Sequence, residues 1–125
     1  MVAKTIKYKD FNGVEREEKF FFNLTKAEIT EMELSTEGGL AERIKNIVES
    51  KDVPSIIKIF KDLILKAYGE KTPDGKRFRK QDDAGVPLYI AFSETEAYST
   101  LFMELATDDT AAAEFVNGIM PSEDK

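Results

Sequence analysis

The most regular pattern of apolar and polar positions in this chain runs over residues 52–69, DVPSIIKIFKDLILKAYG. At about 100° per residue, its isoleucines, leucines and aromatic residues fall on one half of a helix, and most lysines fall on the other. Asp52 and Pro54 are typical of a helix start, and Gly69 is typical of a left-handed C-terminal cap, so we expect a helix over about residues 53–68. The apolar face is so wide that we expect at least two other elements to pack on it. Leu65 is the exception, because it falls among the lysines.

Alternation of apolar and polar residues predicts a β-hairpin over residues 2–22. Asn12 and Gly13 favour the turn, because both residues tolerate positive φ. A two-stranded hairpin is marginal in water, so we expect it to lie on the helices or to gain a further strand. Phe21 falls on the outer face, either as a half-covered aromatic residue or as a contact for a partner. The apolar residues expected on the inner face are Val2, Ile6, Tyr8, Val14, Phe20 and Phe22.

Helical periodicity predicts four further helices, and two of them begin at capping boxes. Thr25 and Glu28 begin the first, and Ser93 and Glu96 begin another, since side chains at this spacing satisfy each other's backbone donors. Met103 lies off the apolar face of the helix that begins at Ser93. The four helices are expected over about residues 25–34, 40–50, 93–106 and 108–117, the last capped by Thr107 or Asp108.

The stretch after the central helix has no clear helical period. Residues 72–75, TPDG, predict a turn. Residues 76–80 carry four cations, but two aspartates follow within an acidic chain, so we expect a solvated loop or a short strand. Residues 86–92 are apolar enough for a buried strand, although Pro87 counts against it.

These elements predict one α+β domain over residues 1–121, with an N-terminal β-hairpin packed on a predominantly helical body of about five helices. A chain of 125 residues is long enough to bury a core of its own. Residues 122–125 are expected to form a flexible tail.

Composition narrows the possible chemistry. The chain has no cysteine and no histidine, which excludes disulfides, thiolate nucleophiles and the commonest general base and transition-metal ligand. A net charge of −6 argues against general nucleic-acid binding, which needs clustered Lys and Arg. No apolar run approaches the roughly 18–20 residues of a membrane span, and the start lacks the apolar core of a signal peptide. We therefore expect a cytoplasmic protein that binds neither nucleic acid nor membrane.

Acidic pairs are the remaining candidates for catalysis or metal binding. They occur at residues 17–18, 82–83 and 108–109, and none has the alternating spacing of a calcium loop. The pair at 108–109 is explained by its place at a helix N-terminus. We expect no catalytic residue, metal or cofactor, and the residues alone favour an interaction protein.

Three sequence blocks resemble the tail assembly chaperones of long-tailed phages and of prophages in Gram-positive bacteria. They are FFFNLTKAEITEMELSTEGGL, IIKIFKDLILKAYGEKTPDGKRF and FSETEAYSTLFMELATDDTAAAEFVNGIMP. Residues 81–91 depart from the resemblance, because they are more apolar than the polar helix expected there. The resemblance implies a non-enzymatic protein in the host cytoplasm that binds the tape-measure protein, helps tail-tube subunits polymerise, and is absent from the mature virion.

The resemblance supplies no short binding motif, so the candidate partner contacts come from the residues themselves. Phe21, Leu65 and Met103 are apolar side chains at outward positions, and we expect them to contact the partner. The free edges of the hairpin also permit self-association. The alternatives are a structural subunit of the phage head or tail, a small carboxylate-based enzyme, and an acidic mimic of nucleic acid, which would need carboxylates gathered on one face.

Overall fold

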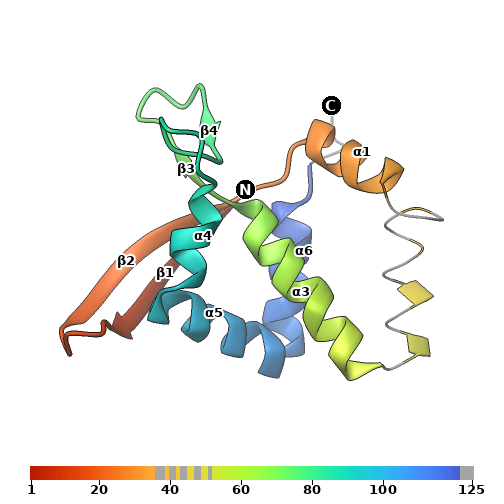
Figure 1. Ribbon diagram of the computed structural model, residues 1–125. Coiled ribbons are helices and arrows are strands. Elements are labelled where there is room, and N and C mark those ends of the chain that lie inside the picture. The colour runs from red at the N-terminus through yellow and green to blue at the C-terminus, as the bar shows by residue number, and fades with distance from the viewer. Residues whose placement is uncertain (36–38, 40–41, 43–44, 47–48, 51, 122–125) are drawn as a thin grey trace.

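The chain folds into a four-stranded antiparallel sheet with helices packed on its inner face (Figure 1), so the predicted α+β class is confirmed. The computed structural model describes residues 1–35, 39, 42, 45–46, 49–50 and 52–121. The helix expected over 40–50 lies largely outside these described residues, and the tail at 122–125 lies wholly outside them. The strands, in spatial order, are β1 (Val2–Lys9), β2 (Glu15–Phe22), β3 (Tyr68–Lys71) and β4 (Phe78–Arg79). The helices are α1 (Lys26–Leu34), α3 (Val53–Ala67), α4 (Leu88–Ser93), α5 (Glu96–Thr107) and α6 (Asp109–Ile119).

The even-numbered residues of the N-terminal hairpin share one face as predicted, because even-numbered residues pair with even-numbered residues along β1 and β2. The carboxylate of Asp10 fixes the turn by accepting the backbone N–H groups of Asn12 and Val14 at 2.9 and 3.0 Å. Gly13 supplies the positive φ of 82° that the turn requires. Val14 was expected on the inner face, but it lies in this turn and is 51% exposed.

The end of the central helix differs from the sequence-based expectation. Helix α3 stops at Ala67, and the chain continues directly into β3, which gives the hairpin the third strand that it needed. Gly69 is not a left-handed cap; it is buried within β3 and pairs with Phe21. A Cβ atom at Gly69 would lie 2.5 Å from the Phe78 ring and 2.6 Å from the Arg79 carbonyl oxygen. Glycine is therefore required here for close packing against β4.

Residues 86–92 do not form the expected buried strand, because the chain enters α4 after Pro87. Proline suits this position, since its fixed φ and missing N–H are both tolerated where a helix begins. Ser93 ends α4 and donates its hydroxyl to the Ile90 carbonyl, so it does not cap the following helix. Thr95 caps α5 instead, by accepting the backbone N–H of Tyr98 at 3.2 Å.

The core lies between the inner face of the sheet and helices α3 to α6, and aromatic rings fill its centre. Phe92 on α4 stacks on Tyr68 of β3, with ring centroids 4.2 Å apart and an interplanar angle of 6°. Phe22 of β2 is fully buried and meets both Phe92 and Phe115. Residues from β2, β3, α4 and α6 thus meet in one cluster, which fixes the helices on the sheet.

The apolar face of α3 is covered over only part of its length by the residues that the structure describes. Leu63, Ile64 and Ala67 in the C-terminal half are at most 3% exposed. In the N-terminal half, Val53 remains 59% exposed and Ile57 remains 40% exposed. One half of this helix therefore belongs to the core, and the other presents apolar surface.

Candidate functional site

An apolar groove lies between α3, α5 and α6 and has a volume of about 700 Å³. Helix α3 contributes residues at positions i, i+3, i+4 and i+7 from Val53, which is the spacing of one helix face. Helix α6 contributes small side chains, which leave room in front of the larger residues of α5. The lining residues are Val53, Ile56, Ile57, Phe60, Phe102, Leu105, Ala106, Asp109, Ala112, Ala113, Val116 and Asn117.

The groove is almost uncharged along its length. Asp109 is the one ionisable side chain among the described residues that line it, and Asn117 is the only other polar one. It therefore lacks the converging polar groups that orient a small ligand or carry out catalysis. An apolar groove of this kind suits the apolar face of another polypeptide.

A second hollow of about 650 Å³ lies on another side of α3, toward α1 and the segment before α4. Its lining is mixed, because lysines and carboxylates from α1, α3 and residue 80 interrupt the apolar side chains. The lining residues are Glu28, Met32, Ser35, Ser55, Lys58, Ile59, Asp62, Leu63, Leu65, Lys66, Tyr68, Lys80, Gln81, Pro87 and Tyr89.

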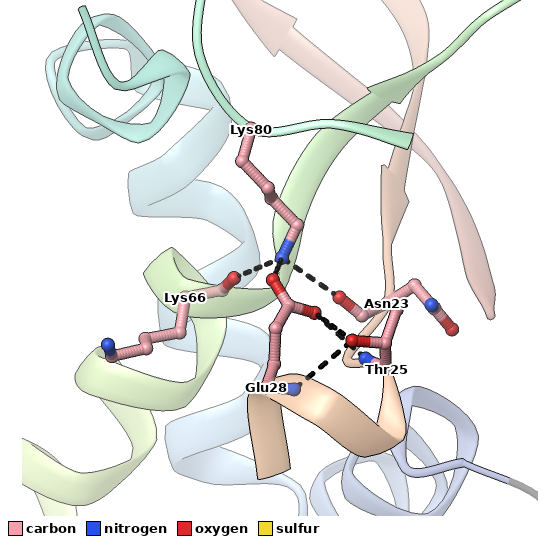
Figure 2. A network of polar contacts seen from close by, with 5 residues as sticks. All are labelled: Asn23, Thr25, Glu28, Lys66 and Lys80. Carbon is pink, nitrogen blue, oxygen red and sulfur yellow. Dashed lines mark hydrogen bonds and ion pairs between the residues drawn. The ribbon is translucent and has the colours of Figure 1, made fainter. Parts of the chain in front are cut away.

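Lys80 holds three segments together at the wall of this second hollow (Figure 2). Its ammonium group donates to the Glu28 carboxylate at 2.8 Å, to the Lys66 carbonyl at 2.6 Å and to the Asn23 carbonyl at 3.1 Å. These acceptors stand at the start of α1, the end of α3 and the end of β2. The sequence places Lys80 in a solvated cationic loop, so its structural role becomes visible only in the folded chain.

The capping box of α1 is part of the same network, and this prediction is confirmed. The other Glu28 oxygen accepts the backbone N–H of Thr25 at 2.8 Å, while the Thr25 hydroxyl accepts the backbone N–H of Glu28 at 3.2 Å. Burial raises the pKa of Glu28, but the hydrogen bonds from Lys80 and Thr25 outweigh burial and hold the pKa below its ordinary value. The carboxylate is therefore stabilised in its charged form.

Replacing Glu28 with glutamine is expected to lower the free energy of unfolding by about 1 kcal/mol at neutral pH. Because folding lowers the pKa of Glu28, its charge stabilises the fold fully above the ordinary value of 4.5 and progressively less as the pH falls through the folded-state value. Urea unfolding at several pH values should show the difference between wild type and Glu28→Gln narrowing in acid. Glu31→Gln, an exposed change on the same helix, serves as the control. If the difference in free energy of unfolding between wild type and Glu28→Gln stayed constant down to pH 3, the charged form of Glu28 would not stabilise the fold through this network.

The structure places the three expected partner contacts on separate surfaces. Phe21 is half-buried on β2, where alternation directs it to the face opposite Phe22. Leu65 is half-buried, packs against the core and lines the second hollow, so it is less isolated than its position among lysines suggests. Met103 on α5 is 55% exposed and lines neither hollow.

Sequence reasoning missed the groove because it assigned the whole apolar face of α3 to the core. The signal that could have found it is the surplus of apolar residues at the start of this helix, from Val53 to Ile57. Phe102 on α5 and Val116 on α6 line the gap opposite this stretch, and no described residue fills it.

The acidic pairs do not assemble into a metal site within the described residues, where no group of three or more acidic side chains is placed to hold an ion. Asp108 caps α6 as expected, by accepting the backbone N–H of Ala111 at 3.1 Å. Among the helices that the structure describes, none is long and apolar enough to cross a membrane.

An apolar groove between helices can receive the apolar face of another polypeptide. A family model described as phage tail assembly chaperone matches residues 1–123 of this chain. The chain therefore belongs to the phage tail assembly chaperone family, as the three sequence blocks predicted. Searches of curated proteins and of solved structures gave no significant match.

Proposed function

We propose that this protein binds the tape-measure protein encoded by the same phage and promotes polymerisation of the tail-tube protein around it. It acts without catalysis, in the cytoplasm of the bacterial host, and leaves before the virion is complete. Membership of the tail assembly chaperone family carries the proposal. The apolar groove supports it, because a chaperone for a long polypeptide needs surface that can cover apolar segments of its partner.

Co-expression with the tape-measure protein of the same genome tests this function. We expect the two chains to co-purify, and we expect the tape-measure protein to be less soluble when expressed alone. Absence of binding, together with normal tails after deletion of the gene, would remove the proposal.

Purified virions distinguish the chaperone from a structural subunit of the head or tail. A chaperone that leaves before completion should be absent from the particle by quantitative mass spectrometry. Stoichiometric amounts of this chain in the virion would favour the structural alternative.

Phe21, Leu65 and Met103 remain our proposed individual contacts for the partner. Met103→Asp gives the clearest expectation, because a side chain that is 55% exposed can be changed with little effect on the core. We expect binding to weaken about tenfold, equivalent to about 1.4 kcal/mol, with a nearly unchanged melting curve. Leu65→Asp and Phe21→Asp should also weaken binding, with some loss of stability because both side chains are half-buried.

Val86→Asp is the matched control for these variants, because Val86 is an apolar residue that is 48% exposed and lines neither hollow. If Met103→Asp binds the partner as tightly as Val86→Asp does, Met103 is not a contact.

A further inference from the structure

We propose that the groove between α3, α5 and α6 receives a single amphipathic helix of the partner, with its apolar face in the groove and a cationic residue at the end nearest Asp109. This inference rests on the proposed function and deepens it. It assigns the surface that binds and the chemistry of the segment that is bound.

The apolar part of the argument comes from the exposed start of α3. Val53 and Ile57 lie one helical turn apart, line the groove and are 59% and 40% exposed. Phe102 and Val116, half-buried on α5 and α6, line the same groove. An occupant that covered these residues would remove apolar surface from water on three helices at once.

The geometry of the groove favours a helix over an extended segment. Its walls are three helices, whose backbone groups are largely paired within the helices themselves. An extended strand lying there would have no sheet edge to pair with and would bury its own N–H and C=O groups without partners. A helix satisfies its backbone internally and presents only side chains to the groove.

The cationic residue of the partner is inferred from the negative charges at one end of the groove. Asp109 lines it, while Asp52 and Asp108 stand immediately before the starts of α3 and α6, which lie at the same end of the molecule (Figure 1). The positive dipole ends of α3 and α6 and the negative dipole end of α5 also lie here, and together they offset only a small part of the three aspartate charges. None of the three aspartates forms an ion pair with a described residue. A lysine or arginine of the partner would therefore be favoured at this end.

The same charges argue against a second copy of this chain as the occupant. In a two-fold contact both copies present the same patch, so neither copy offers a cationic counterpart among the described residues that line the groove. Two chains of net charge −6 would also repel each other. A cationic segment of a different protein avoids this repulsion.

Two isoleucines of equal exposure provide a matched test. Ile57 lines the groove and is 40% exposed, whereas Ile90 on α4 lines neither hollow and is 41% exposed. With the full chain and the co-expressed tape-measure protein, Ile57→Glu should weaken binding at least tenfold, and Ile90→Glu should leave it within twofold. Equal affinities for the two variants would overturn the inference, while continued binding by both would leave the proposed function standing. Failure of the wild-type chain to bind would instead remove the proposed function.

The placement of a cationic partner residue near Asp109 is tested by Asp109→Lys, with Glu114→Lys as its control on the same helix. Glu114 is exposed and does not line the groove. We expect Asp109→Lys to weaken binding several-fold and to reduce its dependence on salt, whereas Glu114→Lys should change neither. Equal effects of the two variants would overturn the assignment of the cationic end.

A labelling measurement keeps the inference testable if Ile57→Glu unfolds the protein. The natural chain has no cysteine, so Ile57→Cys and Ile90→Cys each give one reactive thiol. A fluorophore at position 57 should change its emission when the tape-measure protein is added, and one at position 90 should not. Crosslinking from position 57 should capture a partner segment with apolar residues at helical spacing and a Lys or Arg at one end. Capture of an acidic or extended segment, or crosslinking between two copies of this chain, would overturn the inference.

Discussion

Replacing Phe92 with alanine is expected to lower the free energy of unfolding by about 3–5 kcal/mol. The ring is only 3% exposed and stacks on Tyr68 at 4.2 Å between centroids. It also meets Phe20, Phe22 and Tyr98 at centroid distances of 5.3, 5.8 and 5.7 Å. Its loss would leave a cavity where the sheet meets α4 and α5, because the surrounding rings belong to different elements and cannot all move inward.

Urea unfolding followed by circular dichroism measures this effect, and Tyr89→Ala on the same helix is the control. Tyr89 is 41% exposed, so its replacement should change the free energy of unfolding by less than about 1 kcal/mol. If Phe92→Ala lost no more than Tyr89→Ala, Phe92 would not be the centre of the aromatic cluster.

Replacing Gly69 with alanine is expected to destabilise the fold by about 2–3 kcal/mol, although alanine adds only one methyl group. The added Cβ would lie 2.5 Å from the Phe78 ring and 2.6 Å from the Arg79 carbonyl oxygen. A side chain could rotate away, but the second contact is with backbone, so β3 and β4 would have to separate. Their pairing is short, with only two residue pairs in register. We therefore expect the end of the sheet to loosen.

Two further variants separate this clash from the general effects of replacing a glycine. Gly85→Ala meets no atom within 4 Å but must adopt a φ of +84°, so it should cost about 1–2 kcal/mol through backbone conformation alone. Adding Phe78→Ala to Gly69→Ala should remove the ring contact without relieving the backbone contact. Full recovery of β3–β4 amide protection in the double variant, measured by hydrogen exchange, would show that the backbone contact is unimportant.

These effects concern the half of the molecule that anchors α3, whereas the proposed binding surface lies on the other half. Leu63 and Ile64 hold the C-terminal end of α3 in the core, and Ile57 stands two turns earlier at the groove. Substitutions near Phe92 should therefore act on partner binding mainly through the folded population. Substitutions at Ile57 should act on binding directly.

Local physical chemistry is sufficient to predict the hairpin, the start of α3 and the capping of α1. Alternation sets which residues of β1 and β2 share a face, and Thr25 and Glu28 stand only three residues apart, so the information lies within a few positions. The α+β class follows from the same signals. It was predicted without any knowledge of long-range contacts, and the folded chain confirms it.

The tertiary structure decides what long-range contacts control. From the sequence, Gly69 is expected to be a helix cap, but its close contact with β4 makes it a strand residue. Residues 86–92 are expected to form a strand, but a helix begins after Pro87 and is held in the core by Phe92. From the sequence, Lys80 is expected to be a solvated cation, but in the folded chain two carbonyl groups and one carboxylate accept hydrogen bonds from it.

The candidate site shows the same division. Periodicity alone determined that α3 has one wide apolar face, since that depends only on the order of side chains along the helix. Whether a given stretch of that face is covered depends on how the other elements pack on it, and the C-terminal half of α3 is buried whereas its start borders the groove. The same run of isoleucines therefore serves as core at one end and as exposed surface at the other.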